Sequence, residues 1–134
     1  MFSAVAPDDD AVTVLYHAAC GGHAEVVSEL LADGSEGADD TRIDGRTALW
    51  MAANNGHATV IDALLAAGAD VDARDDHGST PLLVAAEDGR VACVERLLAA
   101  GADLTALDGE GDSVLMVANA HPPVLALLRR ALAV

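Results

Sequence analysis

The heptapeptide LLAAGAD occupies residues 64–70 and occurs again, letter for letter, at residues 97–103 of a 134-residue chain. The shared frame extends on both sides of it. From Thr47 the chain reads TALWMAANNGHATVIDALLAAGADV, and from Thr80 it reads TPLLVAAEDGRVACVERLLAAGADL, 33 positions later. Self-similarity at a fixed period of this length indicates a repeat architecture, in which each copy packs on its neighbours.

Two less regular copies flank this pair. Thr13 opens TVLYHAACGGHAEVVSELLADG, and Ser113 opens SVLMVANAHPPVLALLRR, which is about two residues shorter near His121. We therefore expect a single repeat domain at residues 13–134, behind an N-terminal tail at residues 1–12. The four expected repeats lie at about residues 13–42, 43–75, 76–108 and 109–134.

Local rules predict two short helices in each copy. A Thr or Ser before an apolar run is a good N-cap, which places the first helix after Thr13, Thr47, Thr80 and Ser113. Glycines nine positions later can take the left-handed conformation that ends a helix; they are Gly22, Gly56 and Gly89. The second helix carries an apolar stripe wide enough to contact two neighbours, and Gly68 or Gly101 ends it. Helices this short are marginal alone, so stacking must stabilise them.

The pattern from Asp75 to Asp103, D-x-x-G-x-T-P-L-x-x-A-A-x-x-G-x-x-x-x-V-x-x-L-L-x-x-G-A-D, resembles the ankyrin repeat. The resemblance implies an all-α solenoid of stacked helix-turn-helix pairs with short β-hairpin or turn fingers. The chain departs from the family pattern at the histidine that follows T-P-L. That position holds Tyr16, Trp50, Leu83 and Met116.

The charge balance restricts the possible partners. Seven arginines, no lysine and 22 acidic residues give a net charge of −15, which repels nucleic acid and anionic membranes. We expect a partner with a basic surface or peptide. The sequence shows no secretion or membrane signal, and Cys20 and Cys93 match no disulfide framework. A cytoplasmic location, or another reducing intracellular compartment, is the simplest interpretation.

The sequence favours a protein without enzymatic activity and without a cofactor. Without lysine the chain has no phosphate-binding GxxxxGK loop, and GxSxG is also absent. His17, Cys20 and His23 are metal-ligand types in an H-x2-C-x2-H run. However, we expect glycines to end the helix before His23 and His17 to take a buried position, so we predict no metal there.

The resemblance implies a concave surface, formed by finger tips and first helices, that binds other proteins. Residues at these positions differ between copies, as expected of an interaction surface. They are Ile43, Asp44, Arg46, Asn54 and Asn55 in the second copy, Asp76, His77, Ser79, Glu87 and Asp88 in the third, and Glu110, Asp112 and His121 in the fourth. Trp50 lies beside them, either as an interface anchor or as a filler between repeats.

We therefore predict a non-catalytic protein–protein interaction module that presents an acidic concave surface to a basic partner. A solvated acidic face that serves only solubility is the alternative interpretation of the charges. The alternative function is a structural subunit or fragment that self-associates or completes a larger solenoid. The closing helix, expected from Pro123, has two apolar sides, of which only one can pack inward. These sides are Leu125, Leu128 and Leu132, and Val124, Leu127 and Ala131. We expect a second copy of the chain, the N-terminal tail or a partner to cover the other side, and we favour a two-fold homodimer.

Overall fold

The computed structural model describes residues 7–32 and 45–133, with side chains from residue 14 onward. Within these ranges the chain forms eight helices and no strand. The helices are α1 (Pro7–Gly21), α2 (Ala24–Ala32), α3 (Ala48–Asn55), α4 (Ala58–Ala66), α5 (Pro81–Glu87), α6 (Val91–Ala99), α7 (Val114–Val117) and α8 (Pro122–Leu132).

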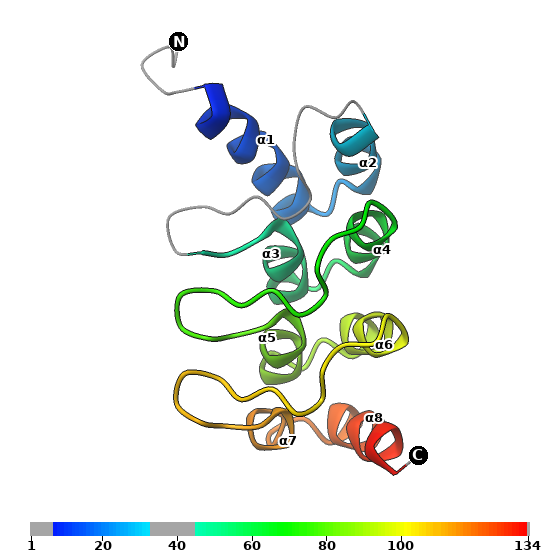
Figure 1. The fold of residues 1–134 in the computed structure, drawn as a ribbon. Helices are drawn as coiled ribbons and strands as arrows, with labels where there is room; N and C mark the ends of the chain where they lie inside the picture. The colour runs from blue at the N-terminus through cyan, green and yellow to red at the C-terminus, as the bar shows by residue number, and fades with distance from the viewer. Residues whose placement is uncertain (1–6, 33–44, 134) are drawn as a thin grey trace.

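The helices stack in two columns (Figure 1). The first helices of the pairs (α1, α3, α5 and α7) form an inner column, and the second helices (α2, α4, α6 and α8) form an outer column. Each helix contacts its pair partner and its neighbours in the same column. The loops at 67–80 and 100–113 project beyond the inner column as fingers (Figure 1). The all-α repeat solenoid predicted from the sequence is thereby confirmed.

Side-chain caps begin the inner helices α3, α5 and α7 where the sequence predicted them. The hydroxyl of Thr47 accepts the N–H of Trp50 at 3.2 Å, and the hydroxyl of Thr80 accepts the N–H of Leu83 at the same distance. Ser113 caps α7 in the same way. At the other end of α3, Gly56 has a φ of +81°, a left-handed conformation that favours glycine.

The N-terminal helix is longer than predicted. It begins at Pro7, so the expectation that it starts after Thr13 is wrong. Proline has a backbone angle suited to the first helical position, and acidic residues, here Asp8–Asp10, favour the positive end of the helix dipole. No glycine or further proline interrupts the sequence before Gly21, so the helix includes Thr13.

Small and medium apolar residues form the core. The first leucine of each LLAAGAD copy, Leu64 or Leu97, is fully buried. The alanine pairs of the inner helices, at 52–53 and 85–86, are also fully buried. Small residues allow neighbouring helix backbones to approach closely while keeping the packing dense. The repeated heptapeptide therefore marks the repeated interface.

The closing helix packs differently from the prediction. It begins at Pro122, one residue before Pro123, and its fully buried residues are Val124 and Leu128. These residues are four positions apart and lie on one helical face. We expected two separate apolar sides, one with Val124 and the other with Leu128. This expectation is wrong, because Val124 and Leu128 are both buried on the inward face. Leu132 is 45% exposed.

A ladder of hydrogen bonds joins neighbouring pairs at the turn between inner and outer helices. The Nε2 atom of His57 lies 2.8 Å from the carbonyl oxygen of Cys20, and that of His121 lies 2.9 Å from the carbonyl oxygen of Glu87. Between these two contacts, Arg90 donates to the carbonyl of Asn54 at 3.2 Å. These bonds satisfy carbonyls at the ends of inner helices, which otherwise lack partners.

The two leucines of one heptapeptide provide a test of the stacking. Leu64→Ala should reduce the free energy of unfolding by about 2–5 kcal/mol, since it leaves a cavity between repeats. Leu65 is only partly buried, and Leu65→Ala should cost about 1 kcal/mol. Urea unfolding of both variants measures the difference, and equal losses would contradict the proposed core.

Candidate protein-binding groove

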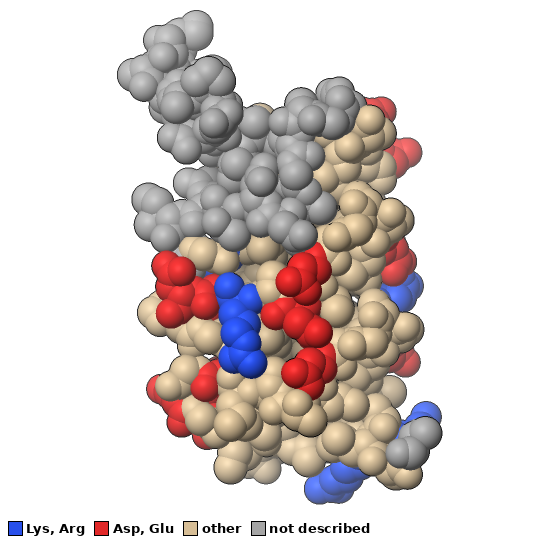
Figure 2. All heavy atoms as spheres, viewed as in Figure 1, with Lys and Arg blue, Asp and Glu red and all other residues tan. Residues whose placement is uncertain are grey.

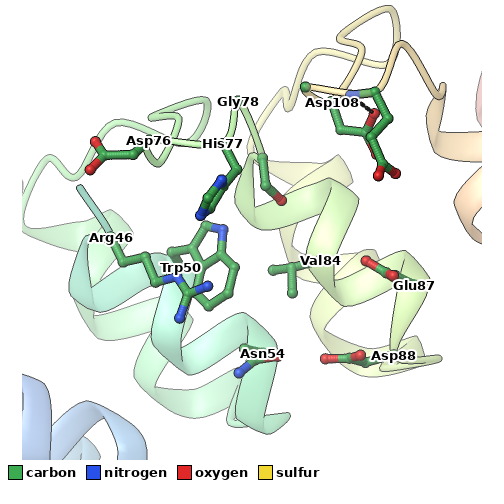
Figure 3. Close-up of a pocket in the computed structure, with 13 residues that line it drawn as sticks. Arg46, Trp50, Asn54, Asp76, His77, Gly78, Val84, Glu87, Asp88 and Asp108 are labelled. Carbon is green, nitrogen blue, oxygen red and sulfur yellow. Dashed lines mark hydrogen bonds between the residues drawn. The ribbon is translucent and has the colours of Figure 1, made fainter. Parts of the chain in front are cut away.

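A groove of about 810 Å³ lies between the finger tips and the inner helices α3 and α5 (Figure 3). One wall is formed by the finger tips and the other by helix side chains. The lining residues are Arg46, Trp50, Asn54, Asp76, His77, Gly78, Ser79, Val84, Glu87, Asp88, Asp108, Gly109 and Glu110. Most of them come from the second and third repeats.

The groove brings together nine residues selected from the sequence. They are Arg46, Trp50, Asn54, Asp76, His77, Ser79, Glu87, Asp88 and Glu110. Asn55 does not line the groove, and its side chain donates to the Met51 carbonyl at 2.9 Å. Asp112 and His121 also lie outside it, the latter in the inter-repeat ladder. Ile43 and Asp44 fall outside the described residues.

Four lining residues were missed in the sequence: Gly78, Val84, Asp108 and Gly109. Gly78 and Asp108 recur at the same place in other copies, so they were assigned to the scaffold. A scaffold residue at a finger tip nevertheless borders the groove. For Gly78, Asp108 and Gly109, the signal was a position beside Asp76 and His77 or in the matching turn of the next copy. Val84 lies on α5 and gave no such signal.

Trp50 forms part of the groove floor. It is 6% exposed, and the guanidinium of Arg46 lies 4.1 Å from the centre of its ring. Tyr16 and Leu83 occupy the same position in their repeats and are also buried. The indole therefore packs between repeats while part of it borders the groove.

Two aspartates build the finger tips in the same way. Asp75 accepts the backbone N–H groups of His77 and Ser79, each at 2.9 Å. Asp108 accepts those of Glu110 and Asp112 at the same distance. The carboxylate of Asp75 is also buried, and it accepts a hydrogen bond from Nε of Arg46 at 3.5 Å. These bonds fix the turns from which the groove side chains project.

The fingers stack closely because of Gly109. A Cβ atom at this position would lie 2.3 Å from the carbonyl oxygen of His77, and no flexible side chain could move aside to relieve that clash. The close approach places the tip of one finger, with Asp76 and His77, directly beside the tip of the next. Side chains from two repeats can therefore contact one ligand.

The groove has a strongly acidic lining. Its described lining residues include five carboxylates, from Asp76, Glu87, Asp88, Asp108 and Glu110, and one guanidinium. Acidic side chains also lie elsewhere, and Figure 2 shows them on both sides of a short column of basic side chains.

Outside the groove, hydrogen bonds to Thr105 lower the pKa of the exposed Asp103. The hydroxyl of Thr105 has the larger effect, and its backbone N–H has the second.

Metal ligands are limited in the part of the chain that the structure describes. Asp108, Glu110 and Asp112 are the one group of potential ligands found close together there, and Asp108 already accepts two N–H groups. Carboxylates with such internal hydrogen bonds are ordinary in turns.

The H-x2-C-x2-H run does not lie on one helix, because α1 ends at Gly21, as predicted. His17 is exposed, so the expectation that it is buried is wrong. Neither Cys20 nor Cys93 forms a disulfide within the described residues. Burial raises the pKa of the Cys93 thiol despite the opposing effects of Arg90 and Arg96. A raised pKa disfavours the reactive thiolate.

Comparison with known proteins identifies the family. An ankyrin repeat model described as three copies matches residues 3–75, and an ankyrin repeat model described as many copies matches residues 64–118. The chain therefore belongs to the ankyrin repeat family, as the resemblance predicted. Ankyrin repeats are generally non-catalytic modules that bind other proteins. A search of curated proteins finds no match, and no helix in the described residues is long and apolar enough to span a membrane.

The finger turns can be tested with neighbouring aspartates. Asp75→Ala should reduce the free energy of unfolding by about 1–3 kcal/mol, because it removes the acceptor of two N–H groups and of Arg46. Asp76 is exposed, and Asp76→Ala should change stability by less than about 0.5 kcal/mol. Thermal and urea unfolding provide the comparison. If both variants were equally stable, Asp75 would not order the finger.

Proposed function

We propose that this protein is a non-catalytic binding module whose groove holds a basic segment of another protein. The observation that carries the proposal is the convergence of five carboxylates from two repeats on one groove. A positively charged ligand would be attracted by all five carboxylates at once. A bound nucleic acid or acidic peptide would be repelled by the same field.

We expect the acidic groups to act mainly by speeding the association of the ligand with the groove. Asp76, Glu87, Asp88 and Glu110 are exposed, and exposed ion pairs typically contribute less than about 1 kcal/mol each. Such charges raise the association rate and give it a strong salt dependence. Affinity must also come from groups that are shielded from water, such as the floor around Trp50.

The solubility interpretation of the charges makes a different prediction. Glu25, Glu29 and Glu95 are exposed on the outer helices α2 and α6, where they can keep the protein soluble without forming a groove. If the groove acids served only solubility, both sets would be equivalent. The two sets therefore provide matched variants of equal net charge.

Charge reversal tests the groove. Changing Asp76, Glu87 and Asp88 together to Lys should weaken binding of the peptide acetyl-Arg-Gly-Arg-Gly-Arg-amide by about tenfold, from roughly 0.5 kcal/mol for each lost pair. The salt dependence should flatten, and the melting temperature should stay nearly unchanged. Calorimetric titration at low and high salt measures these changes.

The control variant changes Glu25, Glu29 and Glu95 to Lys. It has the same net charge as the groove variant. It should bind the peptide more tightly than the groove variant does, because its changed residues are distant from the ligand. Equal affinities for the two variants would show that only net charge matters. An unaltered affinity in the groove variant would also contradict the proposal.

Self-association is a second candidate function, and a specific exposure favours it. Met116 occupies the repeat position of Trp50 and Leu83, which the following repeat buries, yet it is 61% exposed. Leu132 on α8 is exposed as well. A second copy of the chain, or a further repeat, would cover this end of the stack.

Sedimentation equilibrium over about a hundredfold range of concentration tests self-association. The wild-type chain should form a dimer, and Met116→Glu together with Leu132→Glu should remain a monomer. Val26 is exposed at the other end of the stack, and Val26→Glu is the control that should still dimerise. A wild-type monomer at every concentration would end this proposal.

We also propose a reducing intracellular compartment, such as the cytoplasm, as the location of the protein. The chain has two cysteines, Cys20 and Cys93, and Cys93 is buried in the core. Neither thiol forms a disulfide within the described chain. Free thiols persist more readily where the surroundings keep them reduced.

A further inference from the structure

The groove floor contains a buried hydrogen-bond donor without an acceptor. The indole nitrogen Nε1 of Trp50 is shielded from solvent, and no atom of the described residues accepts its proton. An indole N–H is only a donor, so it cannot be satisfied by another donor. Leaving such a group unpaired costs about 1–3 kcal/mol, which a suitable ligand atom could recover.

The position of this donor directs it toward the groove. Trp50 lies on α3, and its N–H edge points toward the finger tip that carries His77 (Figure 3). Both residues line the groove. The His77 side chain is exposed and makes no hydrogen bond or ion pair within the described chain, although its backbone N–H is held by Asp75. No hydrogen bond of the described chain therefore fixes this ring, and a ligand that displaces it would reach the indole.

The charges around the indole select the kind of acceptor. A carboxylate or phosphate would face the five carboxylates of the lining. Arg46 offers little compensation, because its guanidinium is already placed on the indole ring and paired with Asp75. A neutral carbonyl oxygen accepts the indole N–H without this repulsion, and every peptide unit provides one.

We propose that Trp50 donates its indole hydrogen bond to a main-chain carbonyl of the bound basic segment, while a neighbouring basic side chain of that segment reaches Glu87 and Asp88. This proposal rests on the proposed function and specifies its ligand as an extended peptide. Glu87 and Asp88 face Trp50 across the groove (Figure 3). The groove thus recognises a cation and a neutral carbonyl together. A cation without a carbonyl pairs with the carboxylates but leaves the indole N–H without an acceptor.

The single tryptophan of the chain allows a direct test, because its indole N–H gives one nuclear magnetic resonance signal. The probe is acetyl-Arg-Gly-Arg-Gly-Arg-amide, and the control ligand is spermidine, which is matched in charge but has no carbonyl. The peptide should move the indole proton downfield. Spermidine should move the backbone signals of Glu87 and Asp88 and leave the indole proton unchanged.

A variant provides the second measurement. Trp50→Phe removes the donor and should weaken peptide binding about fivefold, while spermidine binding stays the same. If the peptide moves the Glu87 and Asp88 signals but not the indole proton, or if spermidine moves the indole equally, the inference is wrong and the acidic groove stands. If neither ligand binds, the inference fails together with the proposed function.

Discussion

The structure depends on the packing of one repeat against the next. Its described helices are mostly seven to eleven residues long, and helices of this length are marginal in water without tertiary contacts. Leu64 and Leu97 supply the same buried contact in successive copies, and fully buried alanine pairs bring the inner helices together. Each repeat therefore provides a surface that the next repeat needs. Stability accumulates along the stack rather than around one central core.

The same packing produces the groove. Close stacking allows the finger tip at His77 to contact Gly109 of the next finger, so that side chains from separate repeats share one ligand-sized space. The buried carboxylate of Asp75 orders the tip and also binds Arg46. Trp50 then fills the gap beneath it. The groove is thus a consequence of the repeat interface, and four of its five acidic side chains, those of Asp76, Glu87, Asp88 and Glu110, stand at positions that vary between copies.

The sequence predicted the repeat scaffold well because the scaffold depends on local rules that recur at a fixed period. The caps at Thr47 and Thr80 and the left-handed Gly56 follow from such rules. Predictions failed where the surroundings differ between copies. The pattern placed Thr13 at a cap by analogy, but Pro7 starts that helix. His17 is exposed on the described surface of α1, whereas Val84, its equivalent in the third copy, is buried between neighbours.

The groove was predicted in part for a related reason. Residues that vary between copies, such as Asp76 and Glu87, could be identified from the sequence alone. Asp108 and Gly109 could not, since their role in the groove depends on how closely two fingers approach. The unpaired indole nitrogen of Trp50 also required the structure. Periodicity indicates which positions repeat, but the distance between repeats decides which of them meet.

We infer that the stacked repeats present one groove to a basic peptide. Amide hydrogen exchange, measured with and without acetyl-Arg-Gly-Arg-Gly-Arg-amide, tests it most directly. We predict that the peptide slows exchange at the finger tips, residues 75–79 and 108–112, and leaves the outer helices at 58–66 and 91–99 unchanged. Protection confined to the outer helices, or absent from both finger tips, would contradict this inference.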